Sequence, residues 1–281
     1  MHYVTTRVGK VAIQVSGEGP PLLLLHSVAH DHHDYDDVLP SLSKDFQTFA
    51  VDWPGHGDSE MWSPPESATT ALMCDALEDV VEALSLPRAI IMGSSVGGTA
   101  AVRLAARKPD RVRALVLVDS GGSAETSALV RGACWVQGRE LVRSWTGMQF
   151  ARWYLKTPGP GTDSVLRRLE DQRKRAGFIE MDAAMWRSFG TVENDLATEA
   201  RQVTAPTLIV WGKYDPVIRP GVEGRRLRAL LPHAQYVELS TGHVPFVEKP
   251  TDFLAAVRPF LVANRAPAQG RHDGADSAAT P

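Results

Sequence analysis

The segment IIMGSSVGGTA (residues 90–100) joins a β-like run to a helix-forming run. The residues before it are apolar and strand-prone, and those that follow, TAAVRLAA (99–106), are mostly strong helix formers. Ser94 and Ser95 lie at the junction, where the motif Gly-x-Ser-x-Gly centres on Ser95. A sharp turn between strand and helix would expose that serine, so the segment predicts a nucleophile at residue 95.

Outward from this turn, strand-like and helix-like segments alternate along the chain. The first two, 3–7 and 11–16, resemble a hairpin, and the run PPLLLLHS (20–27) is typical of a strand buried on both faces. We expect further strands within 46–54, 88–93, 113–120, 206–212 and 235–240, and helices at 68–86, 96–107, 222–231 and 251–263. This order predicts an α/β fold with a mostly parallel sheet covered by helices on both faces.

One region interrupts the alternation. Residues 123–203 contain several amphipathic, aromatic-rich segments and no convincing strand, so they predict a helical cap inserted between two sheet strands. The core would then comprise residues 1–122 and 204–263. The small, polar residues 264–281 predict a disordered tail.

The composition indicates which kind of partner the protein binds and in which compartment it works. The 281 residues carry a net charge of −3, which gives no basic footprint for nucleic acid or an anionic membrane. Two cysteines form no disulfide framework or metal pair, and the amino terminus has no apolar signal core. We expect a cytoplasmic protein that acts on a small molecule, with a homodimer allowed.

A serine nucleophile needs a histidine base held by a carboxylate. His243 follows the last expected strand and Asp215 follows the strand before it, so both would lie with Ser95 at the carboxyl edge of the sheet. Asp119, at the end of another strand, is the competing acid, and Asp215 is favoured by its loop.

These residues and three further motifs resemble the α/β-hydrolase superfamily, in its capped serine-hydrolase branch. The motifs are DWPGHGDS (52–59), WGKYDP (211–216) and GHVPFVEKP (242–250). The resemblance covers about residues 11–261 and has the triad order of that family, Ser95, Asp215, His243.

The oxyanion hole needs two backbone N–H donors. Val96 supplies one by its position after the nucleophile, and the resemblance assigns the other to Val28. Ser27 stands where family members usually have glycine, which is similar to enol-lactone hydrolases. We expect substrate contacts from Ser27 and from four aromatic residues, Trp135, Trp153, Trp186 and Phe246.

The stretch HDHHDYDD (30–37) invites a metal site. Adjacent loop positions rarely converge on one ion, so we predict no metal and no cofactor, and a polar loop beside the pocket. We expect His26 and His56 to hold loops by hydrogen bonds.

The function predicted is hydrolysis of a small, largely apolar carboxylic ester or lactone through an acyl-enzyme. Two alternatives remain open. One is carbon–carbon bond hydrolysis of ring-fission products on the same triad, and the other is a non-catalytic ligand sensor with a hydrolase-like pocket.

Overall fold

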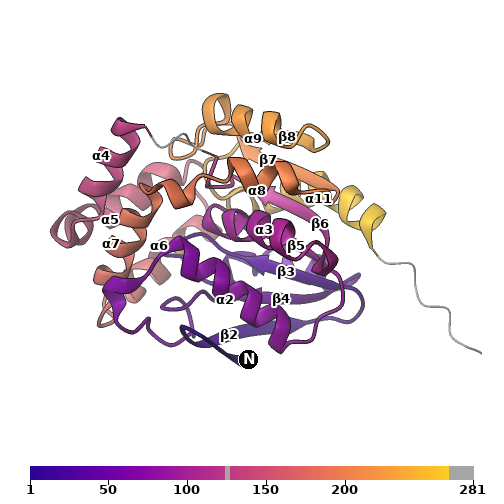
Figure 1. Cartoon of the computed structure of the whole chain (residues 1–281), viewed down its shortest axis with the longest axis horizontal. Helices are drawn as coiled ribbons and strands as arrows, with labels where there is room; N and C mark the ends of the chain where they lie inside the picture. Colours follow the sequence, from indigo (N-terminus) through magenta and orange to yellow (C-terminus); the bar gives the residue numbers. More distant parts are fainter. Residues whose placement is uncertain (124–126, 266–281) are drawn as a thin grey trace, which may run out of the picture.

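The computed structural model describes residues 1–123 and 127–265 and has one eight-stranded sheet (Figure 1). The strand order is β1-β2-β4-β3-β5-β6-β7-β8. Their bounds are β1 His2–Thr6, β2 Gly9–Ser16, β3 Pro21–Leu25, β4 Gln47–Val51, β5 Ala89–Ser94, β6 Val112–Val118, β7 Thr207–Gly212 and β8 Gln235–Leu239. Strands β1, β2 and β4 pair antiparallel and all other neighbours pair parallel. The predicted mostly parallel sheet is confirmed.

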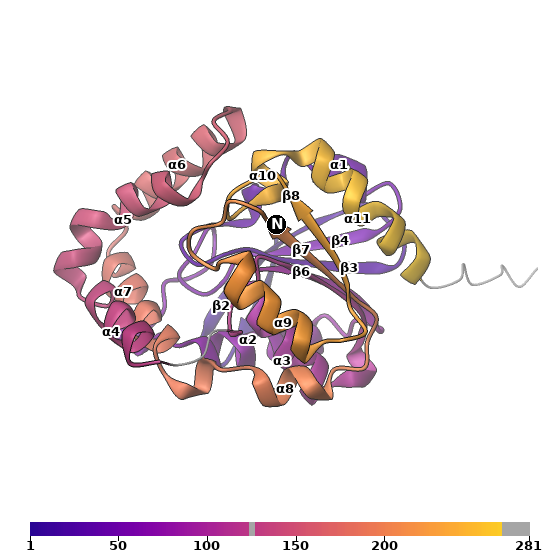
Figure 2. The same cartoon turned by 90° about the horizontal axis from the view of Figure 1, so that it is seen from above.

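The apolar strands lie in the middle of the sheet because both of their faces are covered. Strand β3 is buried along its whole length between β4 and β5, as its unbroken leucine run predicts. Figure 2 shows helices on both sides of the sheet. On one side are α2 (Thr70–Ala83), α3 (Val96–Arg107), α8 (Ala197–Gln202) and α9 (Arg225–Leu230), and on the other are α1 (Leu39–Leu42) and α11 (Pro250–Asn264).

Four helices between β6 and β7 form the insertion: α4 (Ala128–Gln137), α5 (Glu140–Tyr154), α6 (Pro160–Gln172) and α7 (Phe178–Phe189). They gather beyond one end of the sheet (Figure 2). Helix α8 falls within the range 123–203 that we predicted as cap, but it packs against α3 on the sheet. The side chains that pack there, not the linear order, decide to which layer a short helix belongs.

Two other expectations differ from the structure. The helix expected at 222–231 is divided into a π-helical turn, Pro220–Gly224, and α9. Gly224 passes so close to the ring of Trp211 that an added Cβ would lie 3.2 Å from it. The predicted tail begins inside α11, since that helix includes Asn264, and residues 266–281 lie outside the described residues. None of the described helices has both the length and the apolar character needed to cross a membrane.

Candidate active site

Ser95 occupies a strained turn between β5 and α3. Its φ is 53° and its ψ is −116°, a backbone conformation that non-glycine residues rarely adopt. Its N–H donates to the carbonyl of Val118 at 3.0 Å, which ties the turn to β6. A Cβ added to Gly93 would lie 2.3 Å from the carbonyl oxygen of Gly97. A Cβ added to Gly97 would lie 2.4 Å from the carbonyl oxygen of Leu25. The two motif glycines are therefore required by close backbone packing.

His243 and Asp215 form a buried hydrogen-bonded pair. The His243 Nδ1 atom lies 2.7 Å from Asp215 Oδ2. The other carboxylate oxygen accepts from the backbone N–H groups of Val217 and Ile218, at 2.8 and 3.2 Å. Because an ionised carboxylate only accepts, Nδ1 carries the proton and Nε2 is left as the basic nitrogen.

Ser95 and His243 line one cavity of about 540 Å³, although no hydrogen bond joins them in the described structure. The cavity lies between the carboxyl edge of the sheet and the insertion helices, and its walls are mainly apolar. Such nucleophile–base contacts are often long before substrate binds. The arrangement brings a serine, a base and a supporting acid to one pocket.

Of the five predicted substrate contacts, Ser27, Trp153 and Trp186 line this cavity. Trp135 does not: it is 57% exposed on α4, with the Arg139 guanidinium 3.9 Å from its ring centre. Phe246 does not either, because it is fully buried and stacks on Tyr35 with ring centres 4.6 Å apart. Helical periodicity could not tell the inner face of an isolated insertion helix from its outer face.

The loop after β3, for which we predicted an oxyanion donor, is held by a hydrogen bond at Ser27. The Ser27 hydroxyl lies 3.0 Å from the Ser94 hydroxyl. The serine that replaces the usual glycine of the family therefore forms a hydrogen bond with the residue before Ser95. Val28 and Val96 both line the cavity, and neither N–H donates to another described residue. Ala29 has a φ of 66°, which turns the loop.

Asp119 lies next to the pair but holds a different partner. Its Oδ1 accepts from the Gly212 N–H at 2.8 Å, and its buried Oδ2 has no hydrogen-bond partner among the described residues. Burial, and then the neighbouring Asp215 carboxylate, raise the pKa of Asp119 well above its usual range. Asp119 thus holds the end of β7 through Gly212, and Asp215 is the carboxylate that contacts His243.

Glu248 is a site residue that the sequence analysis missed. Its carboxylate accepts from the backbone N–H groups of Gly242 at 2.9 Å and Val244 at 3.3 Å, on either side of His243. It also accepts from Lys156 and Thr157, directly after α5. This one side chain therefore fixes the histidine loop and joins it to the insertion. Its place in the motif GHVPFVEKP was the available signal.

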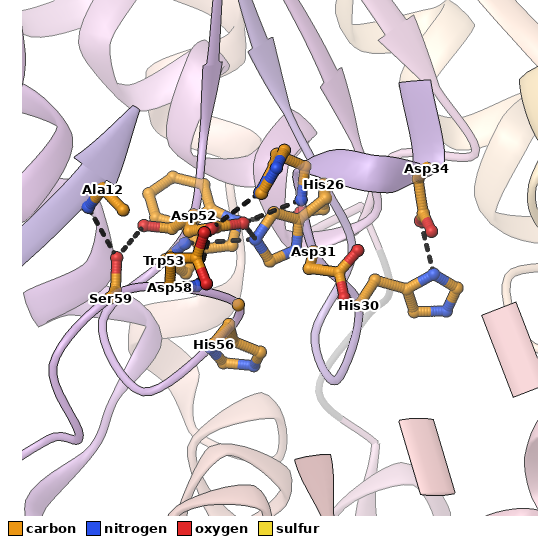
Figure 3. Close-up of polar contacts among 12 residues, drawn as sticks. Ala12, His26, His30, Asp31, Asp34, Asp52, Trp53, His56, Asp58 and Ser59 are labelled. Atoms are coloured by element: carbon orange, nitrogen blue, oxygen red, sulfur yellow. Dashed lines mark hydrogen bonds and ion pairs between the residues drawn. The ribbon is translucent and has the colours of Figure 1, made fainter. Parts of the chain in front are cut away.

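His26 and His56 hold loops, as expected. In His26, Nδ1 contacts the Ser27 carbonyl at 2.7 Å and Nε2 accepts from the Trp53 N–H at 3.1 Å (Figure 3). Burial lowers the pKa of His26 to about 3 and that of His56 to about 4. Both imidazoles are neutral loop supports.

The histidines of the 30–37 loop do not converge on one point. His30 pairs with Asp34, His33 with Asp36, and His32 with the more distant Asp52. A group of ligand-type atoms does meet at His32, Asp52 and Asp58, but the Asp52 carboxylate already accepts from the backbone N–H groups of His32 and Asp58 and contacts the His32 ring. The polar loop is therefore organised by separate Asp–His hydrogen bonds.

Comparisons with known proteins show the family of the chain. The family described as alpha/beta hydrolase fold matches residues 20–152 and 146–250. The chain is 32% identical over 265 residues to a pimeloyl-[acyl-carrier protein] methyl ester esterase of Nitrosomonas europaea, covering 88% of this chain and 98% of the relative. It is 30% identical over 245 residues to a 2-(acetamidomethylene)succinate hydrolase of Mesorhizobium japonicum, covering 82% and 86%.

Solved structures have the same fold. The enol-lactonase from Burkholderia xenovorans superposes with a TM-score of 0.79 at 24% identity, over 93% of this chain and all of that one. A thermophilic esterase from Thermogutta terrifontis superposes with a TM-score of 0.80 at 21% identity, over 94% and 99%.

Proposed function

Because the chain belongs to the α/β-hydrolase fold family, we propose that it is a serine hydrolase that cleaves a small, largely apolar carboxylic ester or lactone. The observation that carries the proposal is the strained turn at Ser95, which shares a cavity with the His243–Asp215 pair. Strain of this kind persists where the surrounding structure holds it for function.

Each residue of the proposed triad has one role. The Ser95 hydroxyl attacks the carbonyl carbon while Nε2 of His243 takes its proton, and the same proton then passes to the leaving alcohol. Asp215 holds the imidazole tautomer and stabilises the imidazolium. Water attacks the acyl-enzyme by the same path and releases the acid. The N–H groups of Val28 and Val96 would hold the oxyanion, each able to contribute a factor of about 10² to 10³ in kcat.

The walls of the cavity support an apolar acyl group. Phe150, Trp153, Trp186 and Phe189 come from the insertion and line it. The insertion thereby acts as a cap, and its aromatic side chains exclude water from the acyl-enzyme. The two sequence relatives are a methyl ester esterase and a 2-(acetamidomethylene)succinate hydrolase, and one solved structure of this fold is an enol-lactonase, which supports ester or lactone cleavage at this site.

The compartment and assembly remain predictions. Cys74 and Cys134 are both buried free thiols, which supports a reducing cytoplasm. Light scattering on the purified chain would measure the oligomeric state and so test the allowed homodimer.

The test of the proposal is active-site labelling with a fluorophosphonate, followed by peptide mapping. We expect one adduct on the peptide that contains Ser95, turnover of p-nitrophenyl acetate and butanoate, and loss of both in Ser95→Ala. Labelling that persists in Ser95→Ala, or that maps to Ser94, contradicts the assignment. A wild type that binds small ligands tightly but turns over no ester, lactone or ring-fission product would instead be a sensor.

A further inference from the structure

A second Asp–His pair contacts the same cavity from the loop after β3. The Nδ1 atom of His30 lies 2.5 Å from Asp34 Oδ2, and its Nε2 atom lies 2.6 Å from the Tyr154 hydroxyl (Figure 3 shows the Asp–His contact). His30 is in the oxyanion loop, and Tyr154 is the last residue of α5. The three side chains thus form a chain of hydrogen bonds from the sheet edge to the insertion.

The ionisation of Asp34 determines which atom donates and which accepts in each of these hydrogen bonds. The Arg168 guanidinium donates to Asp34 Oδ1 at 2.6 Å. Burial by itself raises the pKa of Asp34, but the contacts with His30 and Arg168 outweigh it and lower that pKa. Asp34 is therefore an ionised acceptor, and the Nδ1–H group of His30 donates a hydrogen bond to it. The Nε2 atom then accepts, and the Tyr154 hydroxyl donates to it.

Tyr154 lies beside the proposed triad. Its backbone carbonyl accepts from the His243 N–H at 3.2 Å, and its ring meets the His243 ring edge-on with centres 5.5 Å apart. Burial raises the pKa of Tyr154 far above the physiological range, so the phenol keeps its proton. His30, Tyr154 and Ser95 all line the cavity. Since the phenol O–H donates its hydrogen bond to His30, the Tyr154 oxygen still has lone pairs that can accept a hydrogen bond and has no second O–H to donate.

We propose that Asp34, His30 and Tyr154 form a relay that presents the Tyr154 oxygen as an acceptor for a hydroxyl group on the substrate. The proposal rests on the proposed function and narrows its substrates to esters or lactones with a hydroxyl or enol group near the scissile carbonyl. Tyr154 is then a specificity-determining residue. It forms no bond with the reacting carbon and takes no part in the proton transfer of the triad.

A purely structural role for the Tyr154 bond is less consistent with its surroundings. The insertion is already tied to this loop by Arg168, which also pairs with Asp31 at 2.8 Å. Gln172 adds contacts to the His30 carbonyl at 3.3 Å and to Asp31 at 3.2 Å. Both come from α6, so the insertion is held to this loop without the Tyr154 hydroxyl.

The experiment compares two esters that differ by one hydroxyl group, p-nitrophenyl 3-hydroxybutanoate and p-nitrophenyl butanoate. We expect the wild type to favour the hydroxylated ester in kcat/KM. In Tyr154→Phe the ratio of kcat/KM between the two esters should fall by about tenfold, the size of one net neutral hydrogen bond. Tyr236→Phe is the matched control, because its hydroxyl contacts Glu238 on β8, away from the cavity.

Two variants of His30 test the relay itself and serve if Tyr154→Phe does not fold. His30→Gln can place an amide oxygen near the position of Nε2 and should keep the preference. His30→Leu removes the acceptor, frees the phenol proton to face the substrate, and should lose the preference. Thermal unfolding of each variant separates these effects from loss of structure.

An unchanged ratio of the two esters in Tyr154→Phe overturns the relay, and so does an equal loss for both esters, which identifies a structural anchor. If the wild type hydrolyses neither ester, the proposed function fails. Calorimetric binding of methyl 3-hydroxybutanoate and methyl butanoate to wild type and Tyr154→Phe then decides the relay: it stands only if the hydroxyl-dependent affinity is lost in the variant.

Discussion

Two buried Asp–His pairs contact one cavity, yet their surroundings assign them different tasks. In His243–Asp215 the two residues come from separate strand-end loops and lie 2.7 Å apart. In His30–Asp34 they are four residues apart in one loop, at 2.5 Å. In both pairs, the carboxylate forms a hydrogen bond with the Nδ1 atom of the histidine. The difference lies at Nε2, which in His243 makes no hydrogen bond to a described residue and in His30 contacts Tyr154.

The comparison shows that a carboxylate sets the tautomer of a histidine, whereas the group at the other nitrogen sets its use. A free Nε2 beside a strained serine is available as a base. An Nε2 occupied by a phenol is not, and it can only orient that phenol. The residue types are the same in both pairs, so composition cannot distinguish the two roles.

The strongest test of this difference is to remove each histidine. We expect His243→Ala to lower kcat by about four to six powers of ten with little change in KM, because the interaction is used mainly in the transition state. His30→Ala should keep kcat on p-nitrophenyl butanoate within about tenfold. Steady-state kinetics on that ester measure both. Equal losses in the two variants would remove the distinction.

Removing the acid of the first pair should have the next largest effect. Asp215→Asn should lower kcat by about 10⁴, through the wrong imidazole tautomer and a lost charge. Asp119→Asn should retain most activity, because its amide oxygen can still accept from the Gly212 N–H. Circular dichroism checks that both variants fold. The reverse order of activities would assign the acid role to Asp119.

His56 differs from both of these histidines because it has no carboxylate partner in the part of the chain that the structure describes, and its burial makes the free energy of unfolding depend on pH. The His56 ring packs against His26 and Phe178 and forms a hydrogen bond with the Pro54 carbonyl through Nδ1, and its Nε2 has no hydrogen-bond partner among the described residues. Burial lowers its pKa from 6.5 to about 4 in the folded state. Between these values the unfolded chain binds a proton that the folded chain rejects, so this contribution to stability is lost as the pH falls.

We therefore expect the stability difference between wild type and His56→Gln to shrink by about 2 kcal/mol from pH 7 to pH 5. Urea unfolding of both proteins at the two pH values measures this change. Titrating groups that the two proteins share contribute equally to both and cancel when the two differences are subtracted. A difference that stays constant with pH would show that His56 is not held neutral by burial.

The smallest expected effect concerns two tryptophans, of which Trp153 lines the cavity and Trp135 does not. Trp153→Ala should raise KM for p-nitrophenyl butanoate about fivefold, because it removes roughly 1 kcal/mol of apolar contact from the cavity wall. Trp135→Ala should leave KM unchanged, since that side chain is exposed on the outer face of α4. Equal effects of the two substitutions on KM would contradict the placement of the cavity.

Much of the site could be predicted because its residues stand at fixed places in an alternating fold. Ser95 follows β5 directly, Asp215 and His243 lie in the loops after β7 and β8, and parallel strands end at one edge of the sheet. The expected helix at 96–107 has the bounds of α3, since glycines and a serine mark its start. Glu248, His30 and Tyr154 were missed because their roles depend on contacts between segments far apart in sequence.

The sequence by itself determined the layers of the fold and the strand–turn–helix junction at Ser95, because apolar strand runs, helical periodicity and motif glycines are local properties. Only the tertiary structure decided which aromatic side chains enter the cavity, that Ser27 pairs with Ser94, and that Nε2 of His30 is occupied by Tyr154, 124 residues away. These outcomes depend on how the insertion packs over the sheet edge. That packing is set by side chains of both layers together, and no local pattern encodes it.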